Sequence, residues 1–198
     1  MKVAINGCKG MGSRSVDTDC ILQKSFLGGM IIVAVDASEE PLEEIAKYTA
    51  GNIMKEWDRK PEVSQERLET CLKNGMLLSD KMSVTIMVLD GKSMGVAHRG
   101  SNKLYGLWEG RITDETGKSG NPQLSQIMVR KYRPVQGDAF LLATDGFWNR
   151  LAMQEILIDY IKSRNPQEWI SYLCTRVGLR LEEDNDCYSA ITVMIEEE

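Results

Sequence analysis

Histidine, paired cysteines and long apolar stretches are scarce in this sequence, and each scarcity argues against a class of protein. His98 is the only histidine among 198 residues, and none of the five cysteines stands in a Cys-x-x-Cys pair. Zinc sites are built from such side chains, so we expect no zinc site. No apolar stretch approaches the roughly 20 residues of a membrane-spanning helix, so we expect no membrane partner.

A basic surface and an apolar leader are also missing. The formal net charge is −5 and the pI is about 5.1, whereas nucleic-acid-binding domains normally carry a basic patch. The first residues pass from a short apolar run to Gly7, without the apolar core and cleavage site of a signal peptide. The acidic charge leads us to expect no nucleic-acid partner. An odd number of cysteines without a signal peptide is typical of reduced thiols, so we expect a cytoplasmic protein.

Strand and helix patterns occur in separate blocks along the chain. The composition, 42% hydrophobic and 27% charged, predicts one globular domain over residues 1–198. Short apolar runs rich in β-forming residues predict strands, which we place at 2–6, 20–27, 30–35, 82–89, 93–98, 103–108, 127–132, 139–143 and 188–195. Helical periodicity predicts helices after an N-cap at Ser38, at 63–74, at 154–162 and at 166–179, with polar loops at 7–12 and 113–123. Segregated blocks favour an α+β fold, a four-layer α-β-β-α sandwich with two antiparallel sheets flanked by helix pairs.

Three of the predicted strands meet an aspartate at one end. The strands at 30–35 and 139–143 run into Asp36 and Asp145, and Asp186 shortly precedes the last strand. Carboxylates at sheet rims could converge on one hard divalent cation. The alternative is that these aspartates are unrelated turn formers in a structural domain.

Five short motifs, taken in order, resemble the type-2C metal-dependent Ser/Thr protein phosphatases (the PPM family). They read Arg14-x-x-Asp17-Thr-Asp19, Val35-Asp36, Val96-Ala-His-Arg-Gly100-Ser-Asn-Lys103-x-Tyr105, Leu142-Ala-Thr-Asp145-Gly146-Phe-Trp148 and Asp186-x-x-Ser189. The resemblance extends from about Val3 to Ile195. It implies a central β-sandwich flanked by helix pairs, which agrees with the order of strand and helix blocks.

The same resemblance implies a centre of two Mg²⁺ or Mn²⁺ ions. Asp36 matches the carboxylate that bridges both ions. Ala37 stands where a glycine usually offers its backbone carbonyl to one of them. Asp145 and Asp186 match the remaining ligands of the second ion.

The resemblance further implies roles for two residues of the N-terminal segment. Arg14 matches the arginine that binds the substrate phosphate, and Asp19 matches the aspartate that positions metal-bound water. Metal-activated hydroxide would attack phosphorus in line, without a covalent enzyme intermediate.

The sequence departs from the family pattern around these motifs. Substitutions stand at Thr18, Ala37, Ser38, Ser101 and Asn149. Ser101 and Asn149 replace acids that contribute to a third metal site in some members, so we expect that site to be absent or weak. The flap of bacterial members is reduced to the polar stretch 113–123.

The sequence thus predicts a metal-dependent Ser/Thr phosphatase that acts on phosphoproteins, as a monomer, with a cognate Ser/Thr kinase as a further candidate partner. The alternative is a catalytically weak or inactive phosphatase-like binding module, which the substitutions motivate.

Other conspicuous residues are interpreted as structural. We expect Trp148 to pack in the core, His98 to have a satisfied ring, and Cys20 and Cys187 to be buried small residues, with a redox role as the alternative for these two cysteines.

Overall fold

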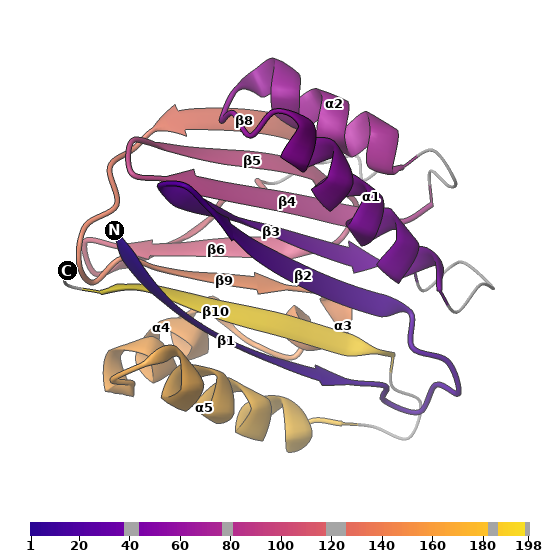
Figure 1. Ribbon diagram of the computed structural model, residues 1–198. Coiled ribbons are helices and arrows are strands. Elements are labelled where there is room, and N and C mark those ends of the chain that lie inside the picture. Colours follow the sequence, from indigo (N-terminus) through magenta and orange to yellow (C-terminus); the bar gives the residue numbers. More distant parts are fainter. Residues whose placement is uncertain (38–43, 77–80, 118–125, 182–185, 197–198) are drawn as a thin grey trace. The chain divides into compact units, whose positions relative to one another are not determined.

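The computed structural model describes residues 1–37, 44–76, 81–117, 126–181 and 186–196 (Figure 1). The chain forms two compact units, and each contains one five-stranded antiparallel sheet within these residues. Unit 1 comprises Met1–Asp17, Lys103–Glu115 and Val135–Glu198, and unit 2 comprises Thr18–Asn102 and Thr116–Pro134. The single domain over residues 1–198 stays a prediction. None of the helices in the described parts of the chain has the length and apolar character needed to cross a membrane.

Unit 2 packs two helices on one face of its sheet (Figure 1). Its elements are β2 (Asp19–Phe26), β3 (Gly29–Asp36), α1 (Ile45–Arg59), α2 (Gln65–Gly75), β4 (Ser83–Asp90), β5 (Ser93–Arg99) and β8 (Gln126–Lys131). The strands are ordered β2-β3-β4-β5-β8. Alternate residues of β3 and β4, such as Val33 and Ile86, join Trp57 of α1 and Leu68 of α2 in one apolar cluster. The period of two in the strands and of 3.6 in the helices thus buries one common core.

Two helix starts in unit 2 differ from the sequence-based prediction. Helix α1 begins at Ile45 with Glu44 as its N-cap, and the predicted cap Ser38 lies outside the described residues. Helix α2 begins at Gln65 because Ser64 caps it: the Ser64 hydroxyl accepts a hydrogen bond from the backbone N–H of Arg67 at 3.3 Å.

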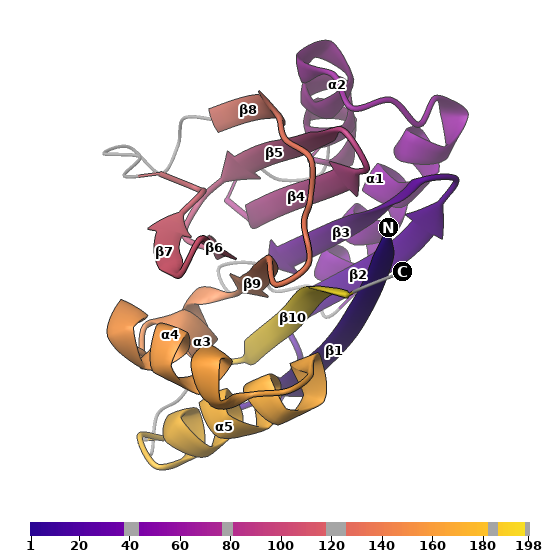
Figure 2. The same cartoon turned by 90° about the vertical axis from the view of Figure 1, so that its left-hand side faces the viewer.

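Unit 1 also carries helices on its sheet (Figure 2). Its elements are β1 (Lys2–Gly10), β6 (Lys103–Trp108), β7 (Arg111–Asp114), β9 (Ala139–Ala143), α3 (Asp145–Trp148), α4 (Met153–Lys162), α5 (Pro166–Gly178) and β10 (Tyr188–Glu196). The strands are ordered β1-β10-β9-β6-β7. Leu141, Phe147, Trp169 and Leu173 are fully buried in its core. The antiparallel pairing in both units and the blocks of helices confirm the predicted α+β class.

Three elements of unit 1 were predicted wrongly or missed. Strand β1 continues to Gly10 through the predicted loop 7–12, because its last residues pair with β10 and the missing side chain of Gly10 leaves room for the Tyr188 ring. Strand β7 overlaps the start of the predicted loop 113–123. A strand of four mostly polar residues is too short to show an alternation of apolar and polar positions. The four-residue helix α3 is likewise too short to show helical periodicity.

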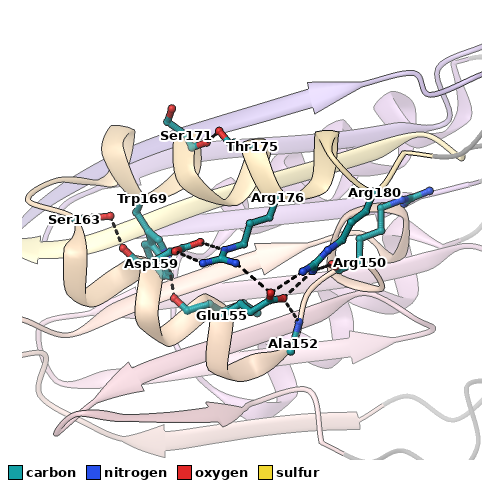
Figure 3. A network of polar contacts seen from close by, with 11 residues as sticks. Arg150, Ala152, Glu155, Asp159, Ser163, Trp169, Ser171, Thr175, Arg176 and Arg180 are labelled. Carbon is teal, nitrogen blue, oxygen red and sulfur yellow. Dashed lines mark hydrogen bonds and ion pairs between the residues drawn. The ribbon is translucent and has the colours of Figure 1, made fainter.

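Charged side chains join α4 to α5 in unit 1 (Figure 3). Arg176 donates to both carboxylate oxygens of Asp159, at 2.5 and 2.9 Å, and to Glu155 at 3.1 Å. Arg180 donates twice to Glu155, at 2.6 and 2.7 Å. Arg180 also donates to the carbonyl of Arg150 at 2.5 Å, so the network extends to the segment after α3.

This network predicts an acid-dependent loss of stability. Hydrogen bonding from Arg180 lowers the pKa of Glu155 from 4.5 to about 2, with a smaller contribution from the backbone N–H of Ala152. A lowered folded-state pKa means that this stabilisation is complete above pH 4.5 and is lost as the pH falls toward 2. We therefore expect the free energy of unfolding in urea to fall across this window, and to fall less in Glu155→Gln. Glu69→Gln, which removes an exposed carboxylate of α2 paired with Lys73, is the control. Parallel pH profiles of Glu155→Gln and the wild type would contradict the prediction.

Candidate metal and phosphate site

One edge of the sheet in unit 1 gathers three of the predicted site residues. In antiparallel neighbours, the end of one strand lies beside the start of the next. The end of β9 and the start of β10 therefore meet at one edge, where Asp145 follows β9 and Asp186 precedes β10. The end of β1 pairs with the start of β10, which brings the loop with Arg14 to the same edge.

Arg14 and Asp186 form an ion pair at this edge. The Nε atom of Arg14 lies 3.1 Å from Oδ1 of Asp186, and the backbone N–H of Cys187 donates to the same oxygen at 2.8 Å. The two side chains are 47% and 30% exposed, so solvent screens the pair and a competing anion can reach the guanidinium. The sequence predicted both residues in the site but not their contact.

The buried thiol of Cys187 holds the loop that carries Arg14. Its Sγ donates to the backbone carbonyls of Met11 and Val16, at 3.6 and 3.3 Å. The loop is further closed by an ion pair between Lys9 and Asp17. The expected burial of Cys187 is confirmed, and its hydrogen bonds give it a positioning role that the sequence did not reveal.

The motif Thr144-Asp145-Gly146 fixes the start of α3 against the segment that follows Asp186. The Thr144 hydroxyl accepts from the N–H of Ser189 at 2.9 Å and donates to its carbonyl at 3.3 Å. A side chain on Gly146 would overlap the carbonyl oxygen of Cys187. Glycine therefore lets α3 approach this segment closely, which brings Asp145 and Asp186 to neighbouring positions.

Lys103 adds a second cation to this edge. It begins β6 opposite Ala143 of β9, and its Nζ lies 2.7 Å from Asp114 and 5.4 Å from the centre of the Trp148 ring. Trp148 packs against the core cluster of unit 1, which confirms its expected structural role. The lysine ammonium lies over its ring, a cation–π geometry.

In unit 2, two buried carboxylates lie side by side. Asp19 at the start of β2 is paired directly with Asp36 at the end of β3, and they are 3% and 4% exposed. Directly opposed residues point to the same face with Cβ atoms about 5 Å apart, where like charges repel. The pairing continues to Ala37, whose N–H donates to the carbonyl of Thr18 at 3.0 Å. A cation at this edge would neutralise the repulsion.

The turn after β5 is anchored at the same edge of the sheet in unit 2. The Ser83 hydroxyl accepts from the N–H groups of Ser101 and Asn102, at 2.7 and 2.9 Å. Gly100 has φ +99°, and a side chain there would overlap Ser83. The amide of the fully buried Asn102 donates to the carbonyl of Ala34 at 3.3 Å, which ties the turn to β3. Ser101, the position of the missing acid, contributes its backbone N–H to this turn.

Two further residues of unit 2 are structural, as expected. His98 is 2% exposed, and its Nδ1 lies 2.8 Å from the Thr85 hydroxyl, so its ring is satisfied. Cys20 is buried in the apolar cluster beneath α1.

The predicted ligand atoms are of the chemical type that a hard divalent cation prefers. Mg²⁺ and Mn²⁺ prefer carboxylate and carbonyl oxygens, and the predicted ligands supply only those. Asp19 and Asp36 belong to unit 2, and Asp145 and Asp186 belong to unit 1. Within the residues that the structure describes, no group of three or more His, Cys, Asp or Glu side chains lies close enough to hold a metal ion.

Of the substituted positions, Ser38 lies outside the described residues and Asn149 caps α3.

Solved structures of serine/threonine phosphatases share this fold. No model of a known protein family and no curated protein matches the sequence. The serine/threonine phosphatase PstP/Ppp of Mycobacterium tuberculosis matches with a TM-score of 0.77 at 16% identity, over 98% of this chain and 99% of the other. The S. agalactiae serine/threonine phosphatase matches with 0.78 at 14% identity, over 98% and 100%. RsbX in complex with magnesium matches with 0.70 at 14% identity, over 97% and 94%.

These matches cover nearly the whole chain and confirm the resemblance inferred from the ordered motifs, together with the predicted fold class. At such low identity they establish the fold alone. The chain has the PPM-type fold of the two serine/threonine phosphatases.

Proposed function

We propose that this chain is a metal-dependent protein phosphatase that hydrolyses phosphoserine or phosphothreonine. The observation that carries the proposal is the placement of the predicted residues on a phosphatase fold. Arg14, Asp145 and Asp186 share one sheet edge of unit 1, and Asp19 and Asp36 are paired at the edge of the sheet in unit 2. Surface turn formers would be solvated, whereas Asp19 and Asp36 are buried, which disfavours unrelated strand-end caps.

We propose that two Mn²⁺ or Mg²⁺ ions bind to these carboxylates. PstP has been solved in complex with two manganese ions and RsbX with magnesium, which supports metal dependence here. Asp36 would bridge the ions, Ala37 would offer its carbonyl to one, and Asp145 and Asp186 would hold the other. Bound divalent ions supply positive charge to the phosphoryl oxygens and lower the pKa of water to the neutral range. Neutral Ser101 and Asn149 would leave a third site absent or weak.

The side chains of the chain itself have distinct tasks in this proposal. Arg14 presents a planar fork of donors that suits phosphate oxygens, and a phosphoryl group would replace Asp186 as its partner. This exchange would couple substrate binding to release of the Asp186 carboxylate. Asp19, as a buried acceptor, would orient the attacking water toward phosphorus. No side chain needs to form a covalent bond with the phosphoryl group.

The proposal predicts metal-dependent hydrolysis. The purified chain should release phosphate from p-nitrophenyl phosphate and from a phosphothreonine peptide in the presence of Mn²⁺, and EDTA should abolish the release. Phosphotyrosine peptide serves as the specificity control. Equal turnover with Mn²⁺ and with EDTA would overturn the proposal. The absence of turnover of any substrate with Mn²⁺ or with Mg²⁺ would overturn it as well.

A phosphate-binding module without turnover is the second candidate. The ion pair between Arg14 and Asp186 favours it, because this carboxylate already has a cationic partner. Calorimetric titration with Mn²⁺ distinguishes the two functions. Binding of two ions supports the enzyme, and phosphopeptide binding without metal binding supports the module.

For the protein's setting we propose phosphoprotein substrates, a cognate Ser/Thr kinase and a monomer in the cytoplasm. Reduced cysteines and the acidic charge support this setting. Mg²⁺ and Mn²⁺ are both compatible with the oxygen donors.

A further inference from the structure

The five cysteines fall into two groups by exposure. Cys20, Cys71 and Cys187 are buried, whereas Cys8 and Cys174 are partly exposed. The two accessible thiols are also the two that contact each other: their side chains form a hydrogen bond. They are separated by most of the sequence, so only the fold brings them together.

Strand β1 and helix α5 hold this pair in unit 1. Cys8 lies on β1 opposite Ala190 of β10, and Cys174 lies on α5 beside Leu173, which is fully buried. Helix α5 packs along β1 and β10 (Figure 1). Both cysteines pack against the core cluster of this unit, so neither thiol is on a loose segment.

The contact makes the two thiols chemically unequal. The hydrogen bond from Cys8 lowers the pKa of Cys174, and the same bond together with burial raises the pKa of Cys8. The thiolate is the reactive form of a cysteine, so the lowered pKa favours Cys174 as the nucleophile of the pair. In contrast, burial raises the pKa of Cys71 to about 11, which keeps it protonated.

We propose that Cys8 and Cys174 form a redox-active dithiol that hydrogen peroxide converts to an intramolecular disulfide. The Cys174 thiolate attacks one peroxide oxygen, the O–O bond breaks, and Cys174 becomes a sulfenic acid while hydroxide leaves. Cys8 then attacks the Cys174 sulfur and gives its proton to the departing hydroxide, so that the S–S bond forms, the S–O bond breaks and water leaves. Together the two thiols lose two protons and two electrons, and the peroxide becomes two molecules of water.

The disulfide would join the first strand of the chain to the helix that precedes its last strand. It would close a loop of nearly the whole sequence and constrain the unfolded chain accordingly. Strand β1 leads into the loop of Arg14, so the oxidised pair would anchor the strand before this loop to α5. The dithiol does not depend on the proposed phosphatase activity.

Peptide mapping of the intact chain tests the proposal. The native protein is treated with hydrogen peroxide, remaining thiols are alkylated, and tryptic peptides are identified by mass spectrometry. We expect one cross-linked pair, Cys8 to Cys174, that dithiothreitol reverses, with Cys20, Cys71 and Cys187 recovered in alkylated form. In urea, the oxidised chain should unfold at a higher concentration than the reduced chain.

The variants Cys8→Ser and Cys174→Ser should each form no intramolecular disulfide, and circular dichroism checks that they fold. The wild-type map gives a result even if a variant does not fold. Recovery of all five cysteines as free thiols from the folded, peroxide-treated chain would overturn the proposal. A disulfide that involves Cys20, Cys71 or Cys187, or sulfinic acid on Cys174 beside a free Cys8, would overturn it as well.

Discussion

Asp36→Asn is expected to lower the Mn²⁺-dependent phosphatase activity by at least about 100-fold, because loss of even an outer partner of a metal ligand costs 10- to 100-fold. Asparagine keeps the shape of the side chain and one oxygen but removes the charge that would bridge two cations. Initial rates on p-nitrophenyl phosphate across a Mn²⁺ series measure the effect. Asp58→Asn, which removes an exposed carboxylate of α1 paired with Lys24, is the matched control and should keep wild-type activity.

The same variant should have the opposite effect on the stability of the metal-free chain. Asp36 faces Asp19 across neighbouring strands, and both are buried. Removing one of the two charges relieves their repulsion, which should raise the free energy of unfolding by up to about 1 kcal/mol. A metal ion that binds the native state stabilises it. Mn²⁺ should therefore raise the melting temperature of the wild type, and it should not raise that of Asp36→Asn, which lacks the proposed ligand. A variant that keeps both wild-type activity and the wild-type response to Mn²⁺ would contradict the assignment of Asp36.

Most of the fold was predictable because most strands and helices have a clear pattern of apolar residues within their own segment. The strands at 103–108 and 139–143 have the predicted bounds, since apolar residues flanked by turn residues define them locally. Helices α4 and α5 were predicted to within about one residue at each end, because their apolar stripes repeat with helical period.

The elements that were missed depend on partners far away in the sequence. The glycine-rich end of β1 is a strand only because β10, at the other end of the chain, pairs with it. Strand β7 is defined by its pairing with β6. The turn after β5 is likewise held by Ser83 of β4, through hydrogen bonds from Ser101 and Asn102. Such contacts leave no periodic pattern in either segment.

For the site, the sequence predicted the residues better than their contacts. Placing an aspartate at a strand end is a local inference, and it holds for Asp36, Asp145 and Asp186. The pairing of Arg14 with Asp186 depends on how the loop between β1 and β2 folds, and the thiol of Cys187 fixes that loop. A side-chain contact of this kind cannot be read from spacing alone.

Gly146→Ala is expected to lower the phosphatase activity by about 100-fold while the chain still folds, because a displacement of 1 Å at a catalytic group can cost that much. The added methyl group would overlap the carbonyl oxygen of Cys187, and backbone on both sides leaves no flexible side chain to move. Helix α3 would shift away from the segment that follows Asp186, and Asp145 would shift with it. The free energy of unfolding should fall by about 1–3 kcal/mol, as for other overpacked sites.

Gly51→Ala is the matched control for this variant. Gly51 lies inside α1, and no atom lies within 4 Å of the position that a side chain would occupy. Alanine is the better helix former, so Gly51→Ala should raise the free energy of unfolding by about 1 kcal/mol and keep the activity. Kinetics and urea unfolding of both variants separate misplacement of Asp145 from a general effect of the methyl group. If Gly146→Ala keeps wild-type activity although it is destabilised, then the seating of α3 does not position Asp145 for the reaction.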